Sequence, residues 1–446
     1  MKRTITKKRL ALLAIVICLI VVGGLYFAHR SFYSAPQTRL APNETYPDMP
    51  EDDFHHYIDL PIDHNDLKRG SFRGFYLFSP NFYQSKNITF LLTDGQMELV
   101  SLKTDFAFFE SVLDGGSYVL IGVRGHSPTL LPEVFKNGQV DYDQALNLYG
   151  SDQQVEDIEN VRLDLINKGL IAPEGKINVF GASGAGVLAQ QYVSKYGANV
   201  NRVILESTGA PDLAKKTHVK YSPDFRDFNP EAARILESLL DQRSVDKKTA
   251  CNILYQIGRT EKSPREAQLK LLENLQNGGN LWSYKIKPIM NLSVLNYVIK
   301  SPSELEARVR WFELVGYDLM HYDSEKETNL LNEISVEAVS DLVDHLKKTN
   351  TSPKEFVIER GKFPGEVLIL KGTEDVVFSD AINIAIQKSY PNSKLLFFND
   401  GHRMQNDIKR YQKVRAVFLE KGFGAPDFMN LIKSGDLVVP SATTGQ

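Results

Sequence analysis

The sequence predicts an α/β protein with a mostly parallel, doubly wound sheet that a helical insertion interrupts. Three observations support this fold class. Short apolar runs, typical of strands buried on both faces, recur along the chain. Helical patterns separate most of them, and this alternation is typical of a parallel sheet. Between residues 206 and 367 only amphipathic helical patterns occur, which indicates an insertion.

The composition fits a globular protein with a large core. The chain has 446 residues, a net charge of −3 and 42% hydrophobic residues. At this length, one large domain with an insertion is favoured over three small domains. The near-neutral charge gives no reason to expect a nucleic-acid partner. The oligomeric state stays open.

Residues 1–30 are predicted to be a membrane anchor or signal segment. Basic residues precede an uncharged run from Leu10 to Ala28, which is about long enough to cross a bilayer as a helix. The basic flank should stay in the cytoplasm, so the catalytic part would lie outside the cytoplasmic membrane. Small residues are poorly placed for cleavage, since Tyr26 stands two residues before Ala28. An uncleaved single-pass anchor is therefore favoured, and a secreted protein is the alternative.

A linker is predicted at 31–53, because this stretch is rich in Pro, Ser and polar residues. Eight strands follow it, of which the first two are expected to form a hairpin. The predicted strands are Tyr57–Ile62, Phe72–Phe78, Ile88–Leu92, Tyr118–Val123, Ile177–Phe180, Val203–Glu206, Val367–Leu370 and Leu395–Phe398. Core helices are expected at Gln153–Lys168 and Val187–Tyr196.

These patterns divide the chain into a core of two parts, 54–211 and 361–425, with a helical lid at 212–360 between them and a tail at 426–446. The predicted lid helices are Pro230–Arg243, Lys247–Ile257, Pro264–Asn277, Pro302–Tyr317 and Ser335–Lys348. A lid is favoured over an independent second domain, because the sheet pattern resumes after it and needs its last strands.

A serine turn follows the strand Ile177–Phe180, and small residues flank Ser183 from Gly181 to Gly186. A sharp strand-to-helix turn leaves no room for larger side chains beside its apex. Such a turn exposes the Ser183 hydroxyl and directs the next backbone N–H groups toward the same space. Alone the pattern also fits a flexible loop or a phosphate-binding turn.

A carboxylate and a histidine follow two later strands. Asp375 comes after Val367–Leu370, and His402 comes after Leu395–Phe398. Serine is a poor nucleophile without a base, and the base needs an acid that fixes its tautomer. Because functional loops gather at the carboxyl ends of parallel strands, we predict a catalytic triad in the order Ser183, Asp375, His402. Glu374 is the alternative acid.

An oxyanion needs two hydrogen-bond donors. The first predicted donor is the backbone N–H of Gly184, which follows the serine. The second is expected from the loop after Ile88–Leu92, where Gly95 lets the backbone turn and Gln96 offers its N–H. An ordinary turn residue is an equal alternative for Gln96.

The chain resembles α/β-hydrolases, and within them the proline iminopeptidase and tripeptidyl aminopeptidase branch. The matching segments are 90–96, 123–127, 153–162, the serine turn and both C-terminal catalytic loops. They cover most of residues 55–425, although the insertion matches only in position and character. The resemblance implies the α/β-hydrolase fold, an acyl-enzyme mechanism and lid carboxylates that bind the free amino terminus of a peptide.

Two departures concern the substrate class. Family members commonly carry Gly-Gly-Pro-Gly where this chain has Gly95-Gln96-Met97-Glu98, and an Asp where it has Gly122. We expect an aminopeptidase-like serine hydrolase acting on small peptides, with a carboxylesterase or lipase as the alternative. A binding protein that retains the fold without catalysis is a third hypothesis. His55 and His56 lack a third ligand at useful spacing, so no metal and no other cofactor is predicted.

Overall fold

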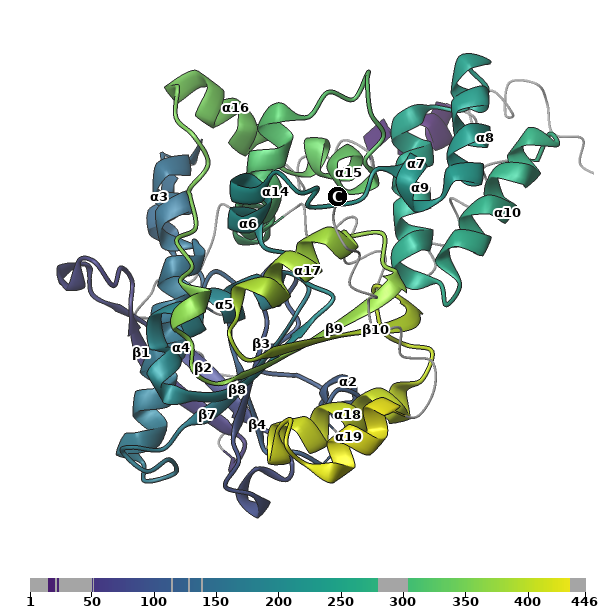
Figure 1. The fold of residues 1–446 in the computed structure, drawn as a ribbon. Coiled ribbons are helices and arrows are strands. Elements are labelled where there is room, and N and C mark those ends of the chain that lie inside the picture. The colour runs from purple at the N-terminus through teal and green to yellow at the C-terminus, as the bar shows by residue number, and fades with distance from the viewer. Residues whose placement is uncertain are drawn as a thin grey trace, which may run out of the picture.

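The structure of the chain is a computed structural model that describes residues 15–20, 22–23, 50, 52–113, 115–126, 129–137, 139–279 and 304–433. Its centre is an eight-stranded sheet (Figure 1). The strands are β1 His55–Pro61, β2 Ser71–Phe78, β3 Thr89–Leu92, β4 Tyr118–Ile121, β7 Ile177–Ala182, β8 Val200–Glu206, β9 Glu366–Glu374 and β10 Ser393–Gly401. All eight predicted strands are present, with boundaries that differ by a few residues.

The strand order is β1-β2-β4-β3-β7-β8-β9-β10. Strand β2 runs antiparallel to β1 and β4, as the predicted hairpin requires, and the other neighbouring strands are parallel. Helical crossovers connect the parallel strands, so their carboxyl ends meet at one edge. This is the α/β-hydrolase fold, and the predicted fold class is confirmed.

Helices cover both faces of the sheet, so the strands are apolar on both faces. In β3, Phe90 and Leu92 contribute to one buried cluster and Leu91 to the other. The first cluster includes residues of α4 and α5, and the second includes residues of α2 and α18. The core helices are α2 Ala107–Glu110, α3 Tyr142–Leu148, α4 Ser151–Asn167, α5 Gly184–Tyr196, α17 Asp380–Ser389, α18 Ile408–Lys421 and α19 Pro426–Lys433.

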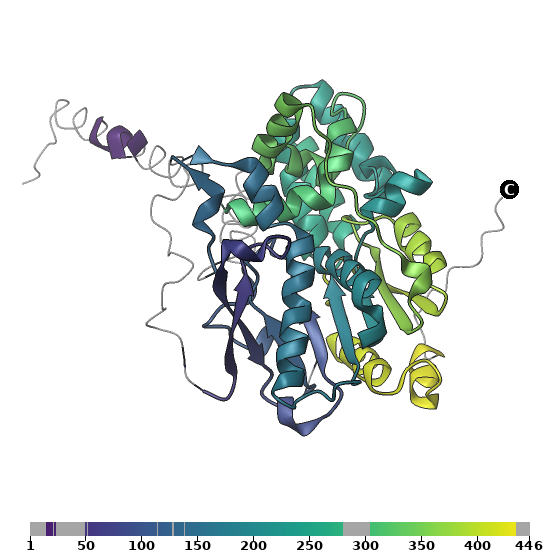
Figure 2. The same ribbon diagram turned by 90° about the vertical axis from the view of Figure 1, so that its left-hand side faces the viewer.

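The described part of the insertion between β8 and β9 contains helices that gather on one side of the sheet in both views (Figures 1 and 2). They are α6 Pro211–Thr217, α7 Phe225–Phe228, α8 Pro230–Asp241, α9 Lys247–Thr260, α10 Pro264–Gln276, α14 Leu305–His321, α15 Leu330–Ala338 and α16 Ser340–Thr349. The single helix predicted at Ser335–Lys348 was wrong: α15 and α16 meet at Val339, which is fully buried. Its burial fixes the bend, and hydrophobic periodicity does not reveal such a break.

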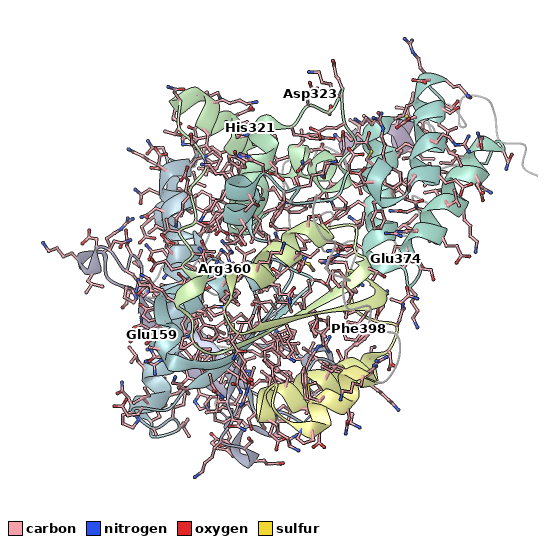
Figure 3. The ribbon with its side chains drawn as sticks, in the orientation of Figure 1. Glu159, His321, Asp323, Arg360, Glu374 and Phe398 are labelled. Carbon is pink, nitrogen blue, oxygen red and sulfur yellow. The ribbon has the colours of Figure 1, made fainter. Side chains whose placement is uncertain are left out.

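The two ends of the insertion are joined by an ion pair. Arg360, on the turn Arg360–Lys362 before β9, donates from Nη1 and Nη2 to the two carboxylate oxygens of Asp212 in α6, at 2.6 and 2.8 Å. The Nε of Arg360 also donates to Gln190 Oε1 of α5 at 2.8 Å. Figure 3 labels Arg360 at this junction. The insertion therefore leaves and rejoins the core at one place.

Several smaller features lay beyond the sequence patterns. The predicted tail contains α19, whose Phe428 is fully buried in the second cluster. Two short strands, β5 Phe135–Lys136 and β6 Gln139–Val140, form a separate ladder. Most of the predicted membrane segment lies outside the described residues. Within the described part of the chain, no helix has both the length and the apolar character that a membrane span needs.

A buried ion pair connects β1, α3 and α4 beneath the carboxyl edge of the sheet. Arg124 donates from Nε and Nη2 to Asp157 at 2.7 and 2.6 Å, and from Nη1 to the carbonyls of Ile62 and Leu148 at 3.0 Å. Burial alone would raise the pKa of Asp157, but Arg124 and His64 hold this pKa below its usual range. Two of the segments behind the family resemblance therefore meet in a structural contact.

Candidate active site

Ser183 stands at the apex of a strained turn between β7 and α5. Its φ of 54° and ψ of −127° lie in a region that L-residues rarely adopt. A Cβ on Gly181 would come within 2.4 Å of the Ala185 carbonyl oxygen, and one on Gly186 within 2.4 Å of Thr208 Oγ1. The small residues around Ser183 are therefore required by close packing, as the sequence predicts.

The three predicted triad residues come together at the carboxyl edge of the sheet. His402 Nε2 lies 3.2 Å from Ser183 Oγ, and His402 Nδ1 lies 3.0 Å from Asp375 Oδ1. Each residue follows a different parallel strand, which explains how positions far apart in sequence meet. The distances are those of a nucleophile, a base and an orienting acid.

Asp375 is held as a buried, ionised carboxylate. Its side chain is 0% exposed, and its Oδ1 accepts the backbone N–H of Val377 at 2.8 Å. Burial alone would raise the pKa of Asp375, but the Lys371 ammonium group and the contact with His402 hold it well below its usual range. Lys371 Nζ lies 3.5 Å from Asp375 Oδ2. The acid is therefore charged at neutral pH.

Glu374, the alternative acid, points elsewhere. Its Oε2 accepts the backbone N–H of Arg265 at the start of α10, at 3.3 Å. Figure 3 labels Glu374 at the end of β9, near the base of the lid helices. The structure thus pairs the histidine with Asp375 and uses Glu374 in a contact between core and insertion.

The two predicted oxyanion donors, Gly184 and Gln96, differ in their hydrogen bonds. Gly184 is the first residue of α5, so its N–H has no acceptor within the helix. The Gln96 N–H instead donates to Asp94 Oδ1 at 3.2 Å. A Cβ built on Gly184 would lie 1.8 Å from Asp94 Oδ2, so the Asp94 carboxyl group packs directly against Gly184.

A cavity of about 40 Å³ opens at the Ser183 hydroxyl. Most of its described lining is apolar or aromatic, and residues of both the core and the insertion contribute. Besides Ser183 and His402, the lining residues with polar groups include Gln96, Arg259, Tyr221 and Tyr255. The insertion side of the cavity is formed by Trp311, Leu314 and Val315 of α14 together with Tyr221, Tyr255, Arg259 and Leu331. The insertion therefore covers the site, as a lid would.

One partly buried carboxylate of α14 lies on the helical stripe that faces this cavity. Asp318 is three residues after Val315, four after Leu314 and seven after Trp311, which puts it on the cavity-facing stripe of the helix. It forms no hydrogen bond or ion pair with other described residues, and the opposing charge that acts on it comes from His321. Burial raises the pKa of Asp318 to about 6.

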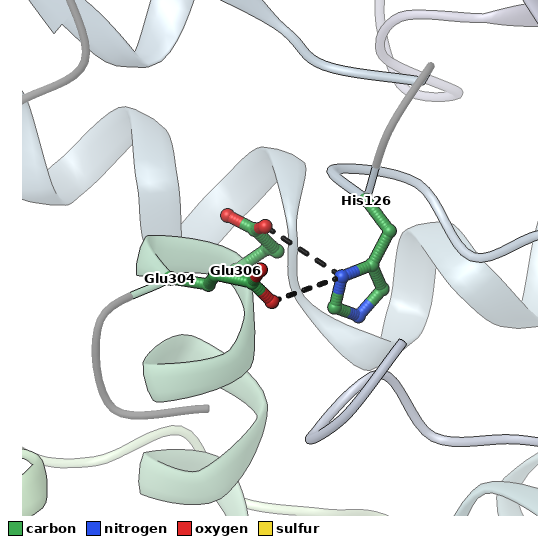
Figure 4. A group of neighbouring side chains, drawn as sticks. All are labelled: His126, Glu304 and Glu306. Carbon is green, nitrogen blue, oxygen red and sulfur yellow. Dashed lines mark ion pairs between the residues drawn. The ribbon is translucent and has the colours of Figure 1, made fainter. Parts of the chain in front are cut away.

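A second group of titratable side chains contacts the loop 93–98 after β3, which we call the oxyanion loop. His126 Nδ1 lies 3.5 Å from Glu304 Oε2 and 3.6 Å from Glu306 Oε1 (Figure 4). Its Nε2 hydrogen-bonds the Gly95 carbonyl oxygen at 2.8 Å. Burial lowers the pKa of His126, but the two glutamates more than offset this and raise it above its ordinary value.

In the described part of the chain, the ligand atoms of His126, Glu304 and Glu306 lie within 4.8 Å of one another, which is close enough to hold a metal ion. A proton on Nδ1 satisfies the same geometry, because imidazolium donates from both ring nitrogens. We therefore treat His126 as a cation that connects α14 to the loop beside Ser183.

Comparisons with known proteins give matches in three-dimensional structure alone. No family profile and no curated protein matches the chain. A serine hydrolase from Cycloclasticus zankles is 12% identical and is covered over 100% of its length by 83% of this chain, with a TM-score of 0.41. An esterase from Exiguobacterium antarcticum is 15% identical, and the alignment covers 78% of this chain and 96% of the esterase, with a TM-score of 0.37. A bromoperoxidase from Bacillus anthracis is 12% identical, and the alignment covers 82% of this chain and 100% of the bromoperoxidase, with a TM-score of 0.38.

Sequence reasoning missed the polar residues that reach the site from other elements. Asp94 was visible in the loop after β3, but its contact with Gly184 depends on the fold. Arg310 of α14 is fully buried and donates from Nε to the Asp94 carbonyl oxygen at 2.8 Å. Its position in a lid helix gave no signal, because most charged residues on such helices face solvent.

Proposed function

We propose that this protein is a serine hydrolase that forms an acyl-enzyme on Ser183. The observation that carries the proposal is the hydrogen-bonded chain from Ser183 Oγ through His402 to the buried Asp375. The strained turn at Ser183 supports it further, because such backbone strain persists where the surrounding structure enforces it for function. A binding protein without catalysis would have no need of this arrangement.

The residues suggest the following steps. His402 Nε2 takes the proton from Ser183 Oγ as the oxygen attacks the substrate carbonyl carbon. The carbonyl oxygen becomes an oxyanion beside the Gly184 N–H, and Asp375 stabilises the imidazolium. His402 then gives the proton to the leaving group as the scissile bond breaks. Water repeats the sequence on the acyl-enzyme and frees Ser183.

The substrate we propose is a peptide with a free amino terminus, cleaved by an aminopeptidase-like reaction. An ammonium group needs a carboxylate partner in an apolar site. Asp318 supports this choice, because it lies on the same stripe of α14 as the cavity residues Leu314 and Val315 and makes no ion pair with other described residues. A pKa of about 6 leaves its carboxylate ionised at pH 7 and above.

A carboxylesterase is the second candidate. The cavity lining supports it, since among the described residues that line the space no carboxylate occurs and Arg259 supplies the cation. An uncharged acyl group, or one with a carboxylate, would suit that lining. Asp318 would then be a buried carboxylate with no substrate role.

Two measurements on a fragment that begins near residue 52 test these alternatives. We expect a fluorophosphonate probe to label Ser183, and neither Ser183→Ala nor His402→Ala to label appreciably. Failure of the wild type to label would reject the hydrolase. Aminoacyl and dipeptidyl amides are then compared with N-acetylated amides and short acyl esters. Turnover of free-amine amides supports the aminopeptidase, whereas turnover of esters alone rejects it in favour of the esterase.

For localisation, we propose a cytoplasmic membrane anchor at 1–30 with the catalytic part outside. The basic flank and the uncharged run Leu10–Ala28 support this. Alkaline extraction of membranes is the test: the full chain should stay with the lipid, and a chain lacking residues 1–30 should not. Release of the full chain into the medium would reject the anchor.

A further inference from the structure

We propose that Asp94 is a further catalytic residue, a neutral carboxylic acid that donates the hydrogen on Oδ2 to the oxyanion of the reaction. The inference deepens the proposed hydrolase function and rests on it. It assigns a role to the loop where the chain departs from the glycine-rich pattern of similar enzymes. Asp94 would supply there a donor that backbone N–H groups provide in other hydrolases.

The position of the carboxyl group is the first argument. Its Oδ1 accepts the Gln96 N–H at 3.2 Å, and its Oδ2 packs against Gly184, the residue after the nucleophile. Asp94 thus lies between the two backbone groups that the sequence predicts as oxyanion donors. Because Oδ1 occupies the Gln96 N–H, that donor is replaced by the carboxyl group itself.

The hydrogen bonds of the two oxygens are the second argument. Oδ1 has the acceptor role of a carbonyl oxygen. Oδ2 is buried and makes no hydrogen bond with any described group, although Asp94 is only 8% exposed. A buried polar atom without a partner is costly, so its partner is expected to arrive with the substrate. A hydroxyl at Oδ2 has a proton to donate to such a partner.

The surrounding charges are the third argument. The nearby cation, Arg310, donates from Nε to the Asp94 backbone carbonyl and pairs through Nη1 with Glu313, so its hydrogen bonds do not reach the Asp94 carboxylate. His126 and Tyr221 are the other titratable groups near it. Burial raises the pKa of Asp94, and the attraction of Arg310 and His126 only partly offsets this.

Electrostatics makes the neutral form necessary. Two like charges in contact repel strongly where little water screens them. An ionised Asp94 beside the oxyanion would therefore cancel most of what one donor contributes to the transition state. A neutral acid in an apolar pocket can instead donate a hydrogen bond. The proton stays on Asp94 throughout, and His402 alone transfers protons.

The test is the rate at which a fluorophosphonate labels Ser183, because the labelled adduct places an oxygen in the same site and needs no known substrate. We compare wild type, Asp94→Asn, Asp94→Ala and the control Glu98→Gln, which makes the same carboxyl-to-amide change on the same loop. Asparagine keeps a donor without charge, and alanine keeps none. Thermal unfolding of each variant verifies that it folds.

We expect Asp94→Ala to slow labelling about 100-fold, as loss of one oxyanion donor does, and Asp94→Asn to slow it less than about tenfold, by the same reasoning. The wild-type rate should fall as pH rises through the pKa of Asp94, which burial raises above its ordinary value, and this fall should be absent in Asp94→Asn. Equal rates for wild type and Asp94→Ala would overturn the proposal, as would Asp94→Asn as slow as Asp94→Ala. Absence of wild-type labelling would instead reject the hydrolase itself.

Discussion

At the residue scale, His402 is the group through which every proposed step passes. It contacts both Ser183 and Asp375, and no other described histidine contacts either residue. His402→Ala should therefore lower turnover by about a thousandfold or more, as loss of a triad base does. Steady-state rates on the best substrate of the panel measure this. A turnover rate of His402→Ala within about tenfold of the wild-type rate would contradict the assignment, because loss of a triad base costs far more.

Asp318 gives a second prediction at this scale, in which stability and function change in opposite directions. Its pKa is higher in the folded protein, at about 6, than the ordinary value of 3.8. The free energy of unfolding therefore falls as pH rises from about 4 to 6, and the loss is complete above that range. Asp318→Asn should stabilise the free protein at pH 8 by roughly 1–3 kcal/mol.

The same variant should raise KM for peptides with a free amino terminus, because the amide cannot pair with an ammonium group. Urea unfolding at pH 4 and pH 8 measures the first effect, and kinetics on aminoacyl and N-acetylated amides measures the second. Asp323→Asn is the control, since that exposed carboxylate pairs with Lys326 at the surface. A KM that rises equally for both substrate types would argue against amine recognition.

The difference between predicted and missed residues has a physical reason. Ser183, Asp375 and His402 each follow a buried strand directly, and the topology of a parallel sheet then brings them together. Asp94 and Asp318 act through contacts that depend on how α14 packs over the sheet. Local patterns do not encode that packing, because a carboxylate on a lid helix looks the same whether it faces solvent or a cavity.

At the element scale, α14 connects the insertion to the oxyanion loop. Arg310 holds the Asp94 carbonyl oxygen, and Glu304 and Glu306 hold His126, which binds the Gly95 carbonyl oxygen. The loop that carries Asp94 is thus fixed from the insertion side. Movement of α14 would be transmitted directly to the groups beside Ser183.

This connection predicts a pH-dependent stability. The folded pKa of His126 is raised above its ordinary value of 6.5, so its contribution is fully present below about pH 6.5 and is lost as pH rises through the folded pKa. The difference in unfolding free energy between wild type and His126→Gln should therefore shrink as pH rises above 6.5 and through the folded pKa of His126. Urea unfolding at several pH values measures it.

The matched control is His345→Gln, because His345 pairs with the exposed Asp143 at 2.8 Å and lies far from the oxyanion loop in sequence. A chelator should leave wild-type stability unchanged. A loss of stability on chelation, or a difference that grows with pH, would mean that a metal ion occupies the group instead of a proton.

The elements themselves could be predicted where hydrophobic pattern decides the structure. The eight strands lie between two apolar layers, so their runs stand out. The break between α15 and α16 did not, because a buried Val339 continues the apolar stripe while the backbone bends. The ladder of β5 and β6 is too short to produce a period.

At the scale of the whole molecule, the pair of Arg360 and Asp212 fastens both ends of the insertion to the core. The side chains of Arg360 and Asp212 are 2% and 14% exposed, so each supplies the opposite charge that the other needs when buried. Arg360→Met should destabilise the protein by about 3–5 kcal/mol, because it leaves a buried carboxylate alone. Thermal and urea unfolding measure the change.

A double variant separates charge from packing. Arg360→Met with Asp212→Leu removes both charges and should recover most of the lost stability, since an apolar pair often replaces a buried ion pair without cost. Single and double variants with equal stability would show that the contact contributes packing and not charge compensation.

The closeness of those two ends bears on how such a protein can change over time. Everything between Asp212 and Arg360 leaves and re-enters the sheet at a single seam, while the nucleophile, its base and its acid all belong to the part outside that seam. A different cap grafted there would leave the three triad residues in place and alter which molecules are admitted, provided that it reproduced the contact of Arg310 with the Asp94 carbonyl oxygen. Exchange of this one inserted segment can therefore change substrate specificity.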